Sequence, residues 1–278
     1  MKFPYRLVGR RFFSRVLGLF LAVVAACVQV QAANGDTSDA LLDRAYKGDA
    51  TAQWEIGVRY TQGSGVPVDW NKAVNWWRKS AEQGNRYAQA MLGSCYAHGS
   101  NGIDRDLVES AKWYLRAAEQ GHKNAQFNIG NCFASGEGVE RNMEIAVSWY
   151  ERSAAQGLAK AQNALARCYA KGDGVRRNQS QALSWYRKAA EQGDADAQYN
   201  LGVCCENGDG LPRDFVDAYG WYSAAAAAGS QEARRALDSL SAMMTSEQLN
   251  RAQSRVKSVN QVYGDGRYDM PRPSSSRK

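Results

Sequence analysis

Histidine is scarce in this sequence, and the residue patterns that usually bind metals or carry out covalent catalysis are missing. His98 and His122 are the only histidines among 278 residues, and no nucleophile or acid stands in register with either. The six cysteines include no Cys-x-x-Cys pair, the spacing typical of zinc sites. We therefore predict no catalytic residue, no metal site and no cofactor.

An apolar run of membrane-spanning length is missing near the N-terminus. The run over residues 16–28 is shorter than the roughly 20 residues that cross a bilayer comfortably. It follows five cations and precedes the small residues of Val30-Gln31-Ala32, which is the layout of a signal peptide. We predict a signal peptide over residues 1–32, a linker over residues 33–42, and an exported protein in the periplasm.

Two other interpretations of the N-terminal segment stay open. An uncleaved leader would anchor the chain in the membrane, with its body facing the periplasm. Val24-Ala25-Ala26-Cys27 resembles a lipobox, which would place a lipid on Cys27. We expect contact with a membrane only through the leader or such a lipid.

The net charge of +7 comes from the two ends of the chain. Residues 1–32 carry five cations and no acid, and residues 245–278 carry seven cations against three acids. Residues 33–244 carry 23 Lys+Arg against 25 Asp+Glu, a net charge of −2. Nucleic-acid binding needs an excess of cations on the folded surface, so we expect no nucleic-acid partner.

What the sequence has in abundance is a repeat of 36 or 37 residues. Its end is marked by a glycine at Gly48, Gly84, Gly121, Gly157, Gly193 and Gly229. A tryptophan followed by a second aromatic residue returns at Trp76, Trp113, Trp149, Trp185 and Trp221. Ala-Gln pairs return at Ala52, Ala88, Ala125, Ala161 and Ala197. This regularity predicts five structural units that end near residues 84, 121, 157, 193 and 229.

Each unit carries the pattern of two helices. In the first helix, small and apolar residues such as Ala125, Ile129 and Phe133 fall on one face. Glycines recur inside it at Gly57, Gly93, Gly130 and Gly202, with Ala166 in the fourth unit. Because a glycine there costs about 1 kcal/mol relative to alanine, we attribute them to the close approach of a neighbouring helix.

The boundaries between the two helices have their own signals. A glycine able to adopt the left-handed conformation ends the first helix at Gly63, Gly99, Gly136, Gly172 and Gly208. A residue able to cap free backbone N–H groups begins the second helix at Asp69, Asp106, Asn142, Asn178 and Asp214. These signals predict a helix, a short turn and an antiparallel helix in every unit.

One short helix pair cannot bury its own apolar stripe, whereas stacked pairs bury it continuously. We therefore predict an all-α fold, a right-handed superhelical solenoid of antiparallel helix pairs, over residues 43–259. Residues 230–240 repeat the first-helix pattern, and residues 245–248 resemble a capping box that opens a last helix to about Val259. We expect this pair to cap the stack and the basic tail, residues 260–278, to be disordered.

The units share the motifs Ala-Gln-x-x-x-Gly-x-x-(Tyr/Phe)-x-x-Gly, Gly-Val, Ala-x-x-Trp-Tyr and Ala-Ala-Glu-Gln-Gly. This set resembles Sel1-like repeats, relatives of the tetratricopeptide repeat, from residue 43 to about residue 240. Members of that family are mostly adaptors that hold signalling, secretion or envelope-assembly proteins together. The resemblance therefore implies partner binding and no conserved chemistry.

Two columns of residues could be mistaken for ligand sites. Cys95, Cys132, Cys168 and Cys204 share one register, so their spacing of roughly 10 Å exceeds the Cα separation of about 7 Å that a disulfide tolerates. We expect them to be free, half-buried thiols. The tryptophan column has helical spacing with alanines, so we expect it to pack in the core and not to form an aromatic cage.

In related solenoids the first helices line the concave side, and positions opposite their buried stripe face a partner. Those positions here are Glu55, Gln62, Met91, His98, Asn128, Asn131, Ser135, Arg167, Lys171, Asn200 and Asn207. The asparagines, with Arg167 and Lys171, can hold a peptide backbone or a carboxylate by hydrogen bonds. We expect a non-catalytic exported scaffold or adaptor that binds a protein or peptide partner there, in envelope signalling or assembly.

Two alternatives come from different functional classes. Ser254-Arg255-Val256-Lys257 fits the Ser-x-x-Lys pattern of penicillin-recognising enzymes, although no Lys-Thr-Gly or Ser-Asp-Asn accompanies it. It would make the chain a cell-wall-directed hydrolase or a lactam-binding enzyme. A lipid on Cys27 would instead make it a membrane-tethered structural lipoprotein.

Overall fold

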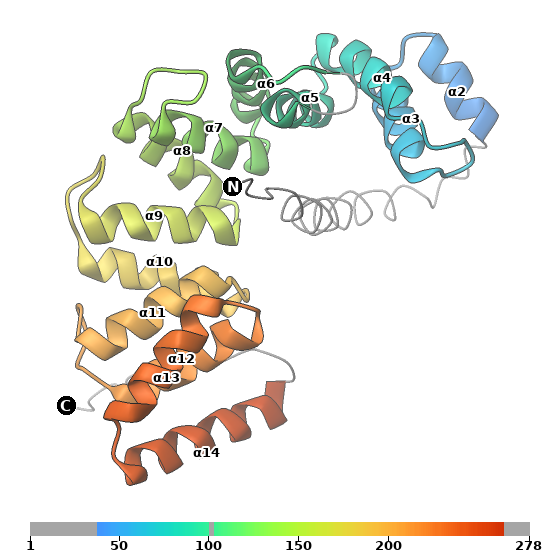
Figure 1. Ribbon diagram of the computed structural model, residues 1–278. Helices are drawn as coiled ribbons and strands as arrows, with labels where there is room; N and C mark the ends of the chain where they lie inside the picture. The colour runs from blue at the N-terminus through green and yellow to red at the C-terminus, as the bar shows by residue number, and fades with distance from the viewer. Residues whose placement is uncertain (1–37, 100–102, 264–278) are drawn as a thin grey trace, which may run out of the picture. The chain divides into compact units, whose positions relative to one another are not determined.

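The computed structural model describes residues 38–99 and 103–263, and this part of the chain is helical (Figure 1). It holds thirteen helices and no strand, which confirms the all-α prediction. The chain divides into two compact units, residues 1–80 and residues 81–278. The predicted signal peptide, residues 1–32, and the tail beyond residue 263 lie outside the described residues.

The first unit contains α2 (Ser38–Tyr46), α3 (Ala50–Gln62) and most of α4 (Trp70–Glu82). The second unit begins in the last turn of α4 and contains α5 (Arg86–His98), α6 (Leu107–Glu119), α7 (Lys123–Ser135), α8 (Met143–Ala155), α9 (Ala159–Lys171), α10 (Gln179–Glu191), α11 (Ala195–Asn207), α12 (Phe215–Ala227), α13 (Gln231–Met243) and α14 (Ser246–Tyr263). Helix α2 begins inside the segment predicted to be a linker, and α14 extends four residues past Val259.

In the second unit every helix from α5 to α12 packs on the next one in the chain, and α14 packs on α12 (Figure 1). Turns of a few residues join the helices, so neighbours in the chain run antiparallel. Helices that pile up in chain order and share continuous apolar cores are those of an α-solenoid, which confirms the predicted fold class.

The predicted helix boundaries are built as expected. The five glycines after the first helices have φ between 63° and 83°, the left-handed region that a glycine adopts without strain. Each predicted cap at the start of a second helix accepts a backbone N–H, as Asn142 Oδ1 does from Ile145 at 3.0 Å. In the capping box of α14, Thr245 and Gln248 accept each other's backbone N–H. Local hydrogen bonds thus set where these helices begin and end.

Buried glutamines explain why Ala-Gln and Glu-Gln-Gly return in the repeat. The glutamine of each Ala-Gln pair donates Nε2 to a backbone carbonyl eight residues earlier, at 3.1 to 3.2 Å. In three units a second glutamine donates in turn to the Oε1 of the first at 2.7 Å, as Gln156 does to Gln126. These bonds join consecutive helices and satisfy polar groups that would be costly to bury alone.

The glycines inside the first helices lie against aromatic rings of the second helices. A Cβ built on Gly130 would lie 2.7 Å from the Tyr150 ring, and one on Gly57 would lie 2.4 Å from Trp77. Contacts this short leave no room for a methyl group unless the ring moves. The close approach predicted from the recurring glycines is therefore made by the ring that follows each tryptophan.

Candidate functional site

A hollow in the second unit has a volume of about 530 Å³. It is lined by α7, α8, α9, the turn after α9 and the start of α11, through Phe127, Asn131, Ala134, Met143, Tyr150, Lys160, Asn163, Ala164, Arg167, Cys168, Lys171, Asp173, Asp194 and Asp196. We call this hollow the α9 groove, because one face of α9 supplies six of its residues.

Three of the eleven residues predicted to face a partner meet in the α9 groove: Asn131, Arg167 and Lys171. Asn131 comes from α7, and the two cations come from successive turns of α9. A fourth, Asn200 on α11, donates Nδ2 to Oδ1 of Asn163 at 3.1 Å and so supports the wall of the groove. The sequence register thus placed these residues on one side of the helices.

The other predicted residues do not line the groove. Glu55 and Gln62 belong to the first unit, where the Glu55 carboxylate pairs with Arg59 at 3.2 Å. Met91 and His98 lie on α5, and His98 is exposed with its Nδ1 2.8 Å from the Ser94 carbonyl oxygen.

The three remaining predicted residues are engaged locally. Asn128 shares a hydrogen bond with the Tyr114 hydroxyl. Ser135 donates to the carbonyl of Asn131 at 2.9 Å, and Asn207 donates to the Asp209 carboxylate at 3.4 Å. Of the eleven predicted residues, four thus lie at the hollow over α7, α9 and α11.

The sequence register missed several residues that line the groove, above all Lys160, Asn163, Asp194 and Asp196. Lys160 and Asn163 stand one residue before and two residues after the Ala161 register position, so a wider stripe would have included them. Asp194 was missed because it caps α11, accepting the Ala197 N–H at 2.9 Å. A cap residue projects beside the helix end and can line a surface there.

The charges in the groove are balanced. Three cations, Lys160, Arg167 and Lys171, line the hollow together with three carboxylates, Asp173, Asp194 and Asp196. Within the described residues none of the six makes an ion pair, so their charges remain available to an incoming molecule. Burial raises the pKa of the Asp194 carboxyl, and the nearby charge of Lys160 lowers it in part.

Amide groups supply directed donors inside the groove. The Tyr150 hydroxyl donates to Oδ1 of Asn131 at 2.7 Å, and Asn163 Oδ1 is occupied by Asn200. Within the described part of the chain, the Nδ2 atoms of Asn131 and Asn163 have no acceptor. Asn163 is only 7% exposed, so its free N–H groups are held in place by a packed side chain.

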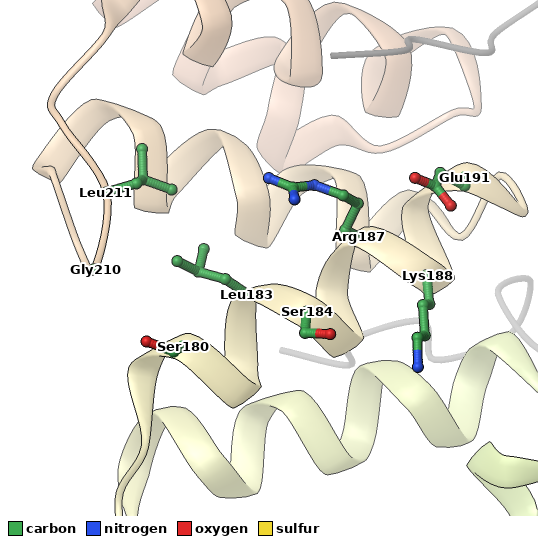
Figure 2. Close-up of a pocket in the computed structure, with 8 residues that line it drawn as sticks. All are labelled: Ser180, Leu183, Ser184, Arg187, Lys188, Glu191, Gly210 and Leu211. Atoms are coloured by element: carbon green, nitrogen blue, oxygen red, sulfur yellow. The ribbon is translucent and has the colours of Figure 1, made fainter. Parts of the chain in front are cut away.

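A second hollow of about 400 Å³ lies on α10, and Figure 2 shows its lining. Leu183 and Leu211 form its apolar end, whereas Ser184, Arg187 and Lys188 lie along the helix. Trp185, expected in the core, is only half-buried, and Lys188 Nζ lies 4.0 Å from its ring centre. Four other tryptophans of the column are buried as predicted, at Trp76, Trp113, Trp149 and Trp221.

The cysteines of the described residues are free thiols, as predicted for Cys95, Cys132, Cys168 and Cys204, but of these only Cys132 is half-buried and the other three are buried. Burial raises the pKa of Cys95, Cys132, Cys168 and Cys204 to about 11, and that of Cys205 to about 12. At neutral pH they are therefore protonated, and a thiol is a poor nucleophile and metal ligand. Cys168 contributes its side chain to the α9 groove as an apolar group.

The described residues contain no group of three His, Cys, Asp or Glu side chains placed to hold a metal ion. Ser254 and Lys257 are exposed on α14 and line neither hollow, whereas Arg255 between them pairs with Asp217. Among the described helices, none combines the length and apolarity needed to cross a bilayer. The groove can thus offer hydrogen bonds and charges to a bound molecule.

The Sel1 repeat family model matches residues 50–85, 86–122, 123–158, 159–194 and 195–230, the period seen in both sequence and structure. The chain belongs to the Sel1 repeat family. Sel1 repeats commonly serve as protein-interaction scaffolds, and proteins built from them are typically non-catalytic. No curated protein matches the chain.

Two solved structures resemble this Sel1 repeat chain, each at 33% identity and a TM-score of 0.68. One is c5321, described as a protective antigen of uropathogenic Escherichia coli with an SLR fold, and the match covers 81% of this chain and 50% of the antigen. The other is a Sel1 repeat protein from Oxalobacter formigenes, with 78% and 87% covered. The chain thus spans half the length of the Escherichia coli antigen.

Proposed function

We propose that this Sel1 repeat protein is an exported, non-catalytic scaffold that binds a segment of another protein in the α9 groove. The observation that carries the proposal is the meeting of Asn131, Arg167 and Lys171 with the buried amide of Asn163 in one hollow. Unused N–H donors and unpaired charges on packed helices favour an external ligand, because a molecule that completes them gains bonds without reorganising the site.

The size and polarity of the groove favour a protein segment over a small apolar ligand. Its volume of about 530 Å³ suits several residues of a chain, and eight of the fourteen residues that line it have charged or amide side chains. A protein backbone offers a carbonyl acceptor at every residue, which matches the free Nδ2 groups of Asn131 and Asn163. A single-signed polymer fits less well, because three carboxylates oppose the three cations.

Crosslinking in living cells, followed by mass spectrometry of captured proteins, tests the proposal. A photoreactive residue at Ala164, inside the groove, should capture a defined protein, whereas one at exposed Arg176 should not. Combining Asn131→Ala with Arg167→Ala should abolish the capture and lower the free energy of unfolding by only about 1 kcal/mol, the cost of losing the Tyr150–Asn131 hydrogen bond, because both replaced side chains are exposed. Capture that is equal at the two positions, or unaffected by the double substitution, would place the partner elsewhere.

Export to the periplasm is part of the proposal and has its own test. The leader pattern of residues 1–32 supports cleavage by a signal peptidase, so the mature N-terminus should lie near Ala33. N-terminal sequencing of protein from the periplasmic fraction checks this. If Cys27→Ser releases the protein from a membrane fraction, the lipid-anchored alternative is correct instead.

A further inference from the structure

The α9 groove has two poles of opposite charge, and we infer that its partner segment carries an acidic and a basic residue in a set order and spacing. This inference rests on the proposed function, since it describes the chemistry of the segment bound in that groove. It depends on where the cations and carboxylates lie along the helices.

The basic pole is at the C-terminal end of α9. Four polar residues of α9 follow one another at intervals of three or four residues and so lie along one face of the helix: Lys160, Asn163, Arg167 and Lys171. Arg167 and Lys171 occupy its last two turns. With a rise of 1.5 Å per residue, they lie roughly 10 to 16 Å along the axis from Lys160.

The acidic pole is at the N-terminal end of α11. Asp194 caps this helix and Asp196 is its second residue, as Lys160 is the second residue of α9. Because α10 is antiparallel to both, α9 and α11 run in the same direction. The hydrogen bond between Asn200 and Asn163, near the middle of each helix, shows that α9 and α11 are aligned along their axes. Asp194 and Asp196 therefore lie beside the N-terminal end of α9, near Lys160 and away from Arg167.

The charge of Lys160 does not neutralise the acidic pole, and the charge of Asp173 does not neutralise the basic pole. One cation faces two carboxylates at the start of α11, and one carboxylate faces two cations at the end of α9. A net charge of −1 thus remains at one end of the groove and +1 at the other. The field of such a pair orients a dipolar ligand and rejects the reversed one.

The free Nδ2 groups of Asn131, in the register of Arg167, and of Asn163, one turn after Lys160, favour an extended backbone in the bound segment. They can donate to carbonyls of a bound segment that does not use those carbonyls in a helix of its own. An extended chain advances about 3.3 Å per residue, so 10 to 16 Å correspond to roughly three to five residues. The segment therefore presents Asp or Glu to Arg167 and Lys171, and Lys or Arg three to five residues away to Asp194 and Asp196.

Selection from a displayed library of random twelve-residue peptides tests this inference on the full chain. Peptides enriched on the wild-type protein should share an acidic and a basic residue three to five positions apart, in one order. The variant with Arg167→Glu, Lys171→Glu and Asp196→Lys, together with Asp194→Asn to keep the cap, should enrich the opposite order. A matched control, Arg176→Glu with Arg177→Glu, changes exposed cations outside the groove and should enrich the wild-type peptides.

Affinities measured by fluorescence anisotropy give the magnitude. Arg167→Glu with Lys171→Glu should weaken the best wild-type peptide by at least about tenfold, the effect of 1.4 kcal/mol. Asn131→Ala should weaken peptides of either charge order equally, because it removes a backbone contact.

The outcomes separate the inference from the proposed function. Enriched peptides that lose binding with Asn131→Ala but share no charge order would overturn the inference and keep the groove as a binding site. Failure to enrich any peptide, or enrichment indifferent to every substitution in the groove, would overturn both.

Discussion

Two neighbouring repeats, residues 123–158 and 159–194, share one backbone plan but differ where their two helices meet. In the first, Gly130 faces the ring of Tyr150, whose hydroxyl donates to Asn131 at 2.7 Å. In the second, Ala166 stands in place of the glycine and is fully buried, and the Tyr186 hydroxyl has no acceptor among the described residues. Arginine replaces asparagine at position 167, and a guanidinium cannot accept a hydrogen bond.

The other units follow the first of these repeats. Where the first helix carries a glycine, a hydrogen bond ties the facing aromatic side chain to that helix: Trp77 donates to the Trp54 carbonyl, Tyr114 bonds with Ser94, and Tyr222 donates to Glu206. A tethered ring is held close and leaves no space for a methyl group. The glycine thus occurs where the ring is tethered, and Arg167 of the α9 groove occupies the position that holds the tethering Asn131 in the neighbouring repeat.

The largest loss of stability is expected when the residue that one repeat has at the Gly130/Ala166 position is placed in the other repeat. Gly130→Ala should lower the free energy of unfolding by about 2 kcal/mol, because its Cβ overlaps the tethered Tyr150 ring. Ala166→Gly should cost about 2 kcal/mol for a different reason, the loss of helix propensity together with that of a fully buried methyl group. Urea denaturation followed by circular dichroism measures both. If Gly130→Ala were as stable as the wild type, the Tyr150 ring would not exclude a methyl group at position 130.

A double-mutant cycle sharpens the role of the tether. With Asn131→Leu, the Tyr150 hydroxyl loses its acceptor and the ring can move away from α7. The cost of Gly130→Ala should then fall by about 1 kcal/mol, a coupling energy typical of residues in contact. Additive losses in the same urea experiment would show that the hydrogen bond does not hold the ring.

The caps of the two first helices also differ, and this predicts a pH effect. His122 Nδ1 accepts the Ala125 N–H at 3.2 Å, whereas Leu158 caps α9 with no side-chain bond. Burial, with the nearby charges of Arg86 and Lys123, lowers the pKa of His122 to about 4. The unfolded chain, with an ordinary pKa near 6.5, therefore binds the proton first, and stability falls as the pH drops from 6.5 to 4.

His122→Asn is the matched variant, because Asn85 caps α5 from the same register and does not titrate. It should retain the cap and reduce the loss of stability between pH 6.5 and pH 4 by about 1 kcal/mol, the usual worth of a cap. Melting temperatures measured across this range for both proteins check it. Parallel pH profiles would mean that His122 does not sense the proton.

The smallest difference concerns the cations over the tryptophans. Arg152 lies 4.5 Å from the Trp149 ring centre, and Lys188 lies 4.0 Å from that of half-buried Trp185. Arg152→Met and Lys188→Met should each cost about 0.5 kcal/mol, the scale of an exposed cation–ring contact. Differential scanning calorimetry resolves this as a small decrease in melting temperature. A loss several times larger at Lys188 would indicate that it supports the α10 hollow by other contacts.

The amino-acid sequence by itself determined the elements and their order. A helix end depends on hydrogen bonds that reach only a few residues, so the caps at Asn142 and Thr245 could be predicted from neighbouring residues. The period of 36 or 37 residues predicted the stacking, because equal units bury equal stripes. The ends of the stack were less accurate: α2 begins before the expected boundary, and α14 runs beyond it, where the repeat pattern no longer applies.

Only the tertiary structure decided which of the candidate residues form one site. Sequence register places a side chain on a face of its helix, but the distance to the next helix depends on the side chains packed between them. That packing brought Asn131, Arg167 and Lys171 into a common hollow and left Glu55 and Met91 outside it. It also added Asp194. The position of Asp194 before α11 predicts its role as a cap, but the sequence does not predict that it lies in the same hollow as the cations of α9.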